Sequence, residues 1–183
     1  MYRTIVEESV RNIAVMDVFS KLIQNRIIFI DDDITPELAN GVIAQMLILD
    51  SQNHDTIEVY INSSGGSVYA GLAIYDISKL IQSPINTTCI GMAASMAAVL
   101  MLMGKTRSAT KHSRIMLHQV SLGSVGKLDD FKVDYEQAAK LQEDIFAIIE
   151  EKTTLTDVKE LFKLDTWYTA KEAFEVNIIN NLL

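Results

Sequence analysis

The sequence predicts an α/β protein built on a largely parallel sheet, and two observations lead to this prediction. Short runs rich in β-branched residues alternate along the chain with longer segments in which apolar residues have helical spacing. Such alternation favours parallel strands joined by helices that cover the sheet. The length of 183 residues suits one compact domain with its own core, so we expect a single domain over residues 1–183.

The elements follow in order. The β-branched runs predict strands at residues 26–30, 56–62, 85–90 and 114–118. A helix is expected to begin at Pro36, because Thr35 is a good N-cap and proline is favoured at the first helical position. Residues 66–81 and 95–103 have the pattern of helices between the later strands. Thr169 and Glu172 have capping-box spacing, which predicts a further helix after residue 169.

A long, highly charged helix is predicted at about residues 127–152. Its apolar stripe consists of Phe131, Tyr135, Ala138, Leu141, Ile145, Ile148 and Ile149. At 1.5 Å per residue the helix would extend about 35 Å, which is long for so small a domain. Two placements are open: the helix projects and offers its stripe to another subunit, or it folds back on the core of its own chain.

Composition excludes several classes of protein. The formal net charge of −8 argues against a nucleic-acid surface, which would be basic. A single cysteine, Cys89, forms no internal disulfide and fits a reducing compartment. The longest apolar run, residues 89–104, is shorter than the roughly 20 residues that span a bilayer. The N-terminus lacks the apolar region of a secretory signal, so we expect a cytoplasmic protein that does not enter membranes.

Residues 61–71, "INSSGGSVYAG", place two glycines between a strand and a helix. Glycines at such a turn let the backbone approach a ligand, and the free N–H groups of a helix start attract negative charge. A tight strand-to-helix turn without a ligand is the alternative. The stretch matches neither of the common phosphate-loop patterns.

Three residues have the types needed for nucleophilic catalysis. Ser95 is the only hydroxyl in "GMAASMAA" (91–98), where small neighbours leave room for a substrate. His118 ends a predicted strand beside a glycine-containing loop, whereas His54 and His112 lie in polar turns. Asp165 precedes "TWYTAKEA". A serine, a histidine and an aspartate suit a nucleophile, a base and an orienting acid, although each also has an ordinary structural reading.

Four stretches together carry a family resemblance: "INSSGGSVYAGLAIYD", "GMAASMAA", "SRIMLHQ" and "DTWYTAKEA". In this order and at nearly these spacings, the chain resembles the Clp protease proteolytic subunit, a self-compartmentalising serine peptidase, over essentially its whole length. The resemblance implies that Ser95 is the nucleophile, His118 the general base and Asp165 its orienter. It also implies an oxyanion hole formed by the backbone N–H groups of Gly66 and Met96.

The resemblance further implies a crotonase-like fold, in which strand–strand–helix turns are wound into a spiral. The helix at about 127–152 would be the protruding handle that joins two stacked heptameric rings into a tetradecamer. Residues 119–126, "QVSLGSVG", would bind an extended substrate peptide, and residues 1–17 would form an axial pore segment. A separate AAA+ unfoldase would use ATP and deliver unfolded polypeptides. This subunit itself would therefore be a serine endopeptidase that needs no cofactor or metal.

The sequence departs from the family pattern at several positions. Ser64 and Val120 replace usual prolines, and Leu164 replaces an arginine that helps ring–ring contact. Asn177 and Asn180 replace a usual glycine and aspartate. The departures remove no catalytic group, but they alter backbone stiffness and the expected contacts between rings.

The family's outer face has apolar pockets that receive a loop of the unfoldase. Tyr60, Leu80 and Ile90 match positions of these pockets, whereas Glu58 stands where an aromatic residue is common. The chain therefore resembles a divergent paralogue that works with a sister subunit.

Two other functions remain as alternatives. The first is a non-catalytic or regulatory ring subunit of the same assembly. The second is a crotonase-type acyl-CoA enzyme, which would use two similar amides to hold an enolate. Neither requires the serine, histidine and aspartate that this sequence retains, so the peptidase is the leading hypothesis.

Overall fold

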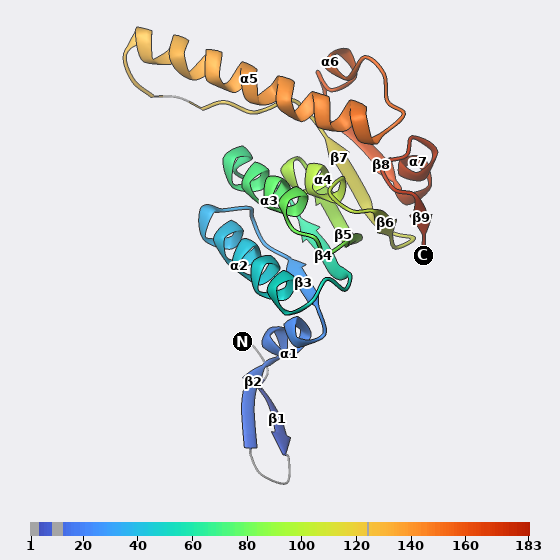
Figure 1. Cartoon of the computed structure of the whole chain (residues 1–183). Helices are drawn as coiled ribbons and strands as arrows, with labels where there is room; N and C mark the ends of the chain where they lie inside the picture. The colour runs from blue at the N-terminus through green and yellow to red at the C-terminus, as the bar shows by residue number, and fades with distance from the viewer. Residues whose placement is uncertain (1–3, 9–12, 124) are drawn as a thin grey trace.

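The computed structural model describes residues 4–8, 13–123 and 125–183 of the chain (Figure 1). Among these residues, seven strands form the main sheet, in the order β3-β4-β5-β6-β9, with β7 paired to β5 and β8 paired to β7. The strands are β3 (Ile27–Ile30), β4 (Ile57–Ser63), β5 (Ile85–Ala94), β6 (Thr106–Ala109), β7 (Arg114–Leu117), β8 (Thr166–Thr169) and β9 (Asn181–Leu182). All pairs are parallel except β7–β8. The predicted α/β class is thus confirmed.

Strand β5 is longer than predicted and pairs with two different strands on one side. Its first half lies beside β6, and its last residues lie beside β7, with Ala94 opposite Met116. The change of partner occurs around Gly91, which has a φ of 84° and would place a Cβ 2.7 Å from the Asn62 side-chain oxygen. The extra residues "GMAA" were not predicted as strand because alanine and glycine have low β-propensity, which parallel pairing on both sides overrides.

Seven helices are described beside the sheet: α1 (Val18–Gln24), α2 (Pro36–Gln52), α3 (Val68–Leu80), α4 (Met96–Met101), α5 (Leu128–Lys152), α6 (Val158–Leu161) and α7 (Ala170–Glu175). Two predicted helix starts are confirmed. The Thr35 hydroxyl accepts a hydrogen bond from the Leu38 N–H, and Thr169 and Glu172 form a reciprocal capping box. No helix within the described ranges is long and apolar enough to cross a membrane.

The sequence left two placements open for the long helix α5, and the structure combines them: one end packs on the core and the other projects. Its C-terminal part is buried against the core through Ile145, Phe146 and Ile149. Its N-terminal part reaches beyond the body (Figure 1), where the side chains of Phe131 and Tyr135 are 43% and 68% exposed. The apolar stripe therefore packs on its own chain at one end and remains uncovered at the other. Ile145 belongs to the first group and is not available to another subunit.

The N-terminal segment forms an antiparallel hairpin of β1 (Thr4–Glu8) and β2 (Ile13–Asp17), which projects from the body opposite α5 (Figure 1). The sequence showed no strand period here, and the two strands are defined by their backbone pairing from Thr4–Asp17 to Glu8–Ile13. Asp17 then caps α1, with its carboxylate accepting from the Ser20 N–H. The pore assignment of residues 1–17 also covers residues 1–3 and 9–12, which lie outside the described residues.

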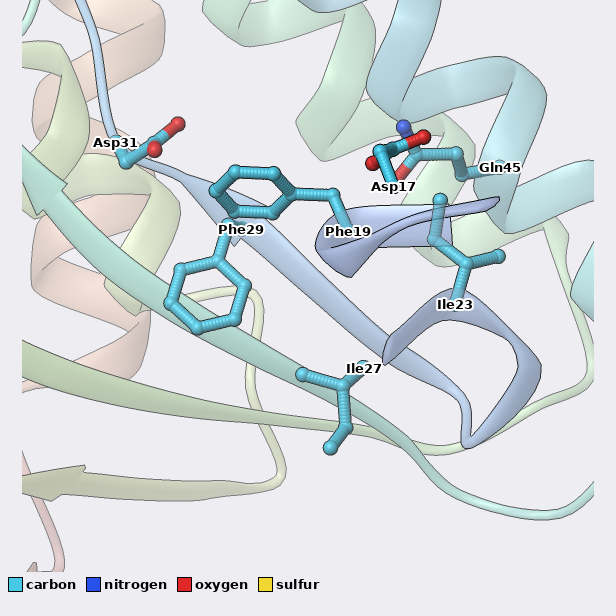
Figure 2. Close-up of a pocket in the computed structure, with 7 residues that line it drawn as sticks. All are labelled: Asp17, Phe19, Ile23, Ile27, Phe29, Asp31 and Gln45. Atoms are coloured by element: carbon cyan, nitrogen blue, oxygen red, sulfur yellow. The ribbon is translucent and has the colours of Figure 1, made fainter. Parts of the chain in front are cut away.

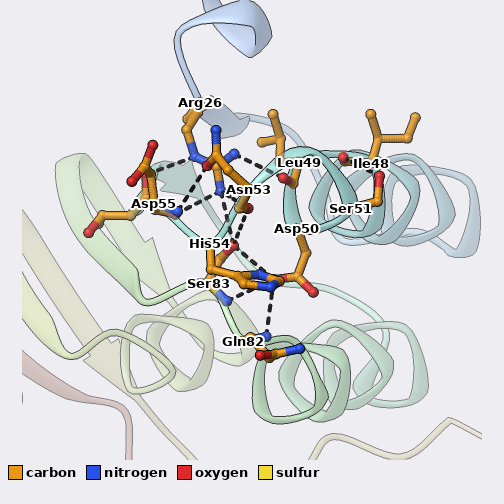
Figure 3. Close-up of polar contacts among 11 residues, drawn as sticks. Arg26, Ile48, Leu49, Asp50, Ser51, Asn53, His54, Asp55, Gln82 and Ser83 are labelled. Atoms are coloured by element: carbon orange, nitrogen blue, oxygen red, sulfur yellow. Dashed lines mark hydrogen bonds and ion pairs between the residues drawn. The ribbon is translucent and has the colours of Figure 1, made fainter.

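Arg26 ties together three segments at the start of the sheet (Figure 3). It has a φ of 61°, and its guanidinium donates to the carbonyls of Leu49 and Asp55 and to the Ser83 hydroxyl, at 2.9, 2.7 and 3.0 Å. The Asp50 carboxylate accepts from the Ser83 N–H at 2.8 Å. The end of α2 and the turns before β4 and β5 are therefore fixed relative to one another.

The buried Arg107 guanidinium has a similar role at the C-terminal edge. It donates to the carbonyls of Gly104, Lys152, Asn177 and Ile178 at 2.9–3.4 Å. Burial lowers the pKa of Arg107 from its usual value, but arginine stays protonated at neutral pH. The Arg107 guanidinium thus supplies hydrogen bonds to carbonyl groups in the region where β6, the end of α5 and the C-terminal segment meet.

The structure explains both asparagine departures in this region. Asn177 has a φ of 58°, a left-handed conformation that asparagine tolerates better than most residues other than glycine. Asn180 accepts from the Arg107 N–H at 2.9 Å and donates to the Lys105 carbonyl at 3.0 Å. An aspartate could make only the first of these contacts while ionised, because it carries no donor.

Replacing Arg107 should destabilise the fold strongly. Arg107→Met fills similar space but leaves several buried carbonyls without a donor, which should lower the free energy of unfolding by about 2–4 kcal/mol. Urea unfolding at fixed protein concentration measures the change. Lys105→Met, at an exposed neighbouring position, is the matched control and should change stability by less than about 0.5 kcal/mol. Equal stability of the two variants would contradict this role for Arg107.

Candidate active site

Ser95 occupies a strained turn between β5 and α4. Its φ and ψ are 55° and −126°, a combination that costs a residue with a side chain about 1–3 kcal/mol and is often retained at functional sites. The turn is held by a hydrogen bond from the Ser95 N–H to the Met116 carbonyl at 2.8 Å. The Ser95 side chain makes no capping bond to α4, so its hydroxyl is available to another group.

That group is His118, whose Nε2 lies 2.7 Å from the Ser95 Oγ. The two residues meet because the ends of β5 and β7 run side by side, with Ala94 opposite Met116. A hydroxyl and an imidazole nitrogen at this separation have the geometry of a nucleophile and its general base. His54 and His112 are exposed in turns, as their sequence surroundings predicted.

Asp165 lies on the far side of the His118 ring. Antiparallel pairing of Leu117 with Thr166 places the two residues next to each other, and Asp165 Oδ1 is 3.9 Å from His118 Nδ1. This separation permits an ion-pair interaction but is too long for a hydrogen bond. The Asp165 side chain is 64% exposed. The structure therefore brings all three predicted residues together, with a tight Ser–His contact and a loose His–Asp contact.

The two-glycine turn packs directly against Ser95. A Cβ on Gly65 would lie 2.7 Å from the Ser95 Cβ and 3.1 Å from the Met96 nitrogen. A Cβ on Gly66 would lie 2.6 Å from the Ile34 carbonyl oxygen. Both residues also have positive φ, 103° and 149°, so glycine is required at each position for close approach and for conformation.

The pairing of Gly66 with Ile34 sets the side of the turn on which its N–H lies. In an isolated parallel bridge, the Ile34 N–H donates to the Gly65 carbonyl and the Ser67 N–H donates to the Ile34 carbonyl, both at 2.8 Å. The N–H of the bridged residue itself, Gly66, then points away from Ile34. The Met96 N–H belongs to the first turn of α4, where helix amides lack intrahelical acceptors.

A cavity of about 90 Å³ joins these groups, lined by Gly66, Val68, Ser95, Met96, Val99, Leu117, His118, Gln119, Val120, Ser121 and Ile145. A neighbouring groove of about 410 Å³ shares Gly66, Val68, Val120 and Ser121 with it. The small cavity has a mixed lining with several apolar side chains, and the groove continues along residues 120–123 and the exposed part of α5. Together they leave open space beside Ser95.

The sequence suggested that the small neighbours of Ser95 leave room for a substrate, but the structure shows that the alanines among them do not. Ala93, Ala94 and Ala97 are buried in the core, so they do not leave space for a substrate. Their small side chains instead allow the glycine turn and the neighbouring strands to approach the serine closely. Residues 66, 68 and 120–121 supply the open space.

Val120 lies on the wall of the cavity and forms a contact that proline could not make. Its N–H donates to the Gln142 side-chain oxygen on α5 at 3.0 Å, and the preceding Gln119 N–H donates to the Phe162 carbonyl at 3.2 Å. Sequence reasoning did not identify Gln142, because a lone glutamine on a charged helix carries no signal. Residues 119–120 are thus held from both sides.

A second cleft, of about 400 Å³, lies between α1, β3 and α2 (Figure 2). Its lining residues are Asp17, Phe19, Ile23, Ile27, Phe29, Asp31 and Gln45. The Phe19 and Phe29 rings meet edge to face at 5.5 Å, and Phe29 stacks on Tyr60 at 5.3 Å. This lining contains no serine, cysteine or histidine, so the cavity beside Ser95 is the better candidate for a catalytic site.

Within the described ranges, no three His, Cys, Asp or Glu side chains gather as a metal site would require.

Cys89 is a second side chain with nucleophilic potential, and its surroundings make it inert. It is fully buried in β5, and burial raises the pKa of its thiol to about 11. Only the thiolate is nucleophilic, and at pH 8 this group remains a neutral thiol.

We therefore expect Cys89 to resist a thiol reagent such as 5,5′-dithiobis(2-nitrobenzoic acid) at pH 8 until the protein is unfolded in urea. The thiol introduced by Ser51→Cys, at an exposed position, should react at once and serves as the positive control. Native-state reaction of Cys89 at the same rate would contradict the burial and pKa described here.

Comparison with known proteins agrees with this geometry. The profile of the family described as Clp protease matches residues 10–183. An ATP-dependent Clp protease proteolytic subunit of Bacteroides thetaiotaomicron is 43% identical over 98% of this chain and 84% of its own length. One from Deinococcus radiodurans is 38% identical over 98% of this chain and 90% of its own. Proteolytic subunit 1 of Prochlorococcus marinus is 37% identical over 100% and 96%. The chain therefore belongs to the Clp protease family, and its α/β architecture is the crotonase-like fold of that family.

Proposed function

We propose that this chain is the proteolytic subunit of an ATP-dependent Clp protease and acts as a serine endopeptidase on unfolded polypeptides. The observation that carries the proposal is the 2.7 Å contact between Ser95 Oγ and His118 Nε2, at the mouth of a cavity beside an extended groove. The membership of the family and the names of its relatives support the same activity.

In the first half of the reaction, the Ser95 Oγ attacks the carbonyl carbon of the scissile peptide bond while His118 Nε2 takes its proton. The carbonyl electron pair moves to oxygen, where the N–H groups of Gly66 and Met96 stabilise the negative charge. One such donor contributes roughly 3–4 kcal/mol in another class of serine protease. Collapse of the intermediate breaks the C–N bond, and His118 gives its proton to the leaving amine. Asp165 stabilises the imidazolium that forms between these steps.

In the second half, His118 takes a proton from water, and the resulting hydroxide attacks the Ser95 ester. Collapse releases the new carboxyl terminus and returns the proton to Ser95 Oγ. The cavity of about 90 Å³ would receive the side chain next to the cleaved bond. Residues 119–123 would bind the peptide as an added strand.

A regulatory ring subunit of low intrinsic activity is the second candidate, and one observation favours it. Asp165 is 64% exposed and 3.9 Å from His118, so the third member of the triad is only loosely engaged in a single chain. The strained Ser95 backbone favours the catalytic reading, because a subunit without activity has no need to retain a conformation of this cost. Covalent labelling with a fluorophosphonate separates the two, since only an activated serine reacts.

The uncovered half of α5 supports assembly into stacked heptameric rings, with α5 as the handle between them. Phe131 and Tyr135 lie on the same face of the helix at i and i+4 and present apolar surface to solvent. Leu164, 79% exposed next to Asp165, would add an apolar contact where the family has an arginine. The assembly would work in the cytoplasm with a separate AAA+ unfoldase, which hydrolyses the ATP, and a sister subunit could share the rings.

Removing triad groups should abolish peptide hydrolysis without preventing assembly. Ser95→Ala and His118→Ala should each lower kcat for a fluorogenic peptide by at least about 10⁴-fold, and Asp165→Asn by about 10²–10⁴-fold through the wrong histidine tautomer. Native mass spectrometry verifies assembly in each case. Activity of Ser95→Ala above a trace, with contaminating peptidases excluded, would refute the assignment of the nucleophile.

The exposed face of α5 should be required for double rings. Phe131→Asp combined with Tyr135→Asp places two charges in the proposed ring–ring contact, where an unpaired buried charge costs several kcal/mol. Light scattering should show single rings or smaller species, while circular dichroism remains unchanged because both side chains are exposed in the single chain. Val133→Asp, on the opposite face of the same turns, is the control. Double rings in both variants would exclude α5 as the contact.

A further inference from the structure

The glycine turn beside Ser95 is fastened to one short stretch of chain, residues 32–34, which we call the brace. The Ser63 hydroxyl donates to the Asp32 carbonyl at 2.7 Å and accepts from the Gly65 N–H at 3.1 Å. Two backbone hydrogen bonds of 2.8 Å join Ile34 to the carbonyl of residue 65 and the N–H of residue 67. These contacts hold the two ends of the turn and its middle against the brace.

A further contact joins two side chains on the outside of the turn. The Ser64 hydroxyl donates to the Asp33 carboxylate at 2.6 Å. A bond to an ionised acceptor is stronger than one between neutral groups. Both residues are exposed, however, so water competes with the contact, and the fold does not need it in order to form.

Asp33 is well placed to act as an anchor. Its own N–H donates to the Asp32 side chain at 2.8 Å, and its carbonyl accepts from the Thr35 N–H at 2.9 Å. Thr35 in turn caps the 17-residue helix α2. The carboxylate is therefore attached to a rigid element, whereas Ser64 immediately precedes the two glycines.

The turn needs such an anchor because glycines have the greatest conformational freedom of all residues. The Gly66 N–H lies two residues beyond Ser64, and a donor stabilises a transition-state oxyanion only when it is held in the right position before the reaction. The pairing with Ile34 sets the side of the turn on which this amide lies, and a restraint at residue 64 narrows the range of orientations that the amide samples there.

We propose that Asp33 is a positioning residue of the oxyanion hole, which acts through Ser64 to orient the Gly66 N–H. This role rests on the proposed peptidase function of Ser95. It implies a loss in kcat rather than in KM when the contact is removed, because the oxyanion exists only after substrate has bound. The pH dependence of kcat/KM should stay unchanged, because His118 keeps its surroundings.

The test uses steady-state hydrolysis of a fluorogenic peptide by assembled enzyme, with active sites counted by a fluorophosphonate probe. Ser64→Ala and Asp33→Ala should each lower kcat about tenfold, less than the 10²–10³-fold loss of a whole oxyanion donor. The double variant should be no worse than either single variant, because both remove the same contact. Ser64→Thr, which keeps the hydroxyl, should retain most of the rate.

Two further variants separate positioning from other effects. Ser64→Pro has no hydroxyl but fixes φ, so it should recover most of the rate lost in Ser64→Ala. Asp31→Ala removes an equal charge two residues from Asp33 and should leave kcat within about twofold of the unaltered enzyme. A full tenfold loss in Asp31→Ala would assign the effect to charge and overturn the proposal, as would additive losses in the double variant.

The outcomes also distinguish this role from the function on which it rests. Unchanged kcat in Ser64→Ala and Asp33→Ala, in an enzyme whose Ser95 reacts with the probe, overturns the positioning role alone. A shift of the kcat/KM pH profile in these variants would show that His118 is disturbed, and it too would overturn the role. Failure of Ser95 to react in the unaltered assembly would overturn the proposed function and the positioning role together.

Discussion

The parallel pairing of β5 with β7 is the constraint on which the site depends. It places Ala94 opposite Met116 and lets the Ser95 N–H donate a hydrogen bond to the Met116 carbonyl. The Ser95 hydroxyl therefore lies within hydrogen-bond distance of His118. The pairing requires β5 to leave β6 halfway along its length. The buried Ser113 stabilises this change of partner, because its hydroxyl donates to the Cys89 carbonyl at 2.9 Å and accepts from the Gly91 N–H at 3.2 Å.

Small residues make this arrangement possible by allowing backbones to come close together. Gly65 touches the Ser95 turn, Gly66 touches Ile34, and the alanines of β5 and α4 are buried beneath both. A side chain at Gly65 would push the glycine turn away from Ser95, and a side chain at Gly66 would push the turn away from Ile34. The stretches "SSGG" (63–66) and "GMAAS" (91–95) therefore form the two sides of one contact, and their small residues reflect close packing.

The sequence was sufficient to predict the elements with strong local signals. The helix starts at Pro36 and after Thr169 followed from capping chemistry, and the strands with β-branched runs followed from composition. The alanine-rich end of β5, the short strands β6, β8 and β9 and the N-terminal hairpin were missed, because long-range pairing decides them. Similarly, the residue types at 95, 118 and 165 indicated a triad, but only strand register shows that they meet. Asp33 and Gln142 gave no signal, because their roles exist only through contacts with residues far away in sequence.

Asp165 belongs to a different part of the sheet from Ser95 and His118. Ser95 and His118 follow strands in the interior of the sheet, whereas Asp165 precedes β8, whose one partner among the described strands is β7. The loop before it is held by the Thr166 hydroxyl, which donates to the carbonyls of Leu161 and Leu164 at 3.0 and 3.1 Å. In the proposed double ring, a subunit packed over Leu164 would also exclude water from Asp165. Because electrostatic interactions strengthen as the effective dielectric falls, assembly would tighten the contact with His118 and couple catalysis to the closed chamber.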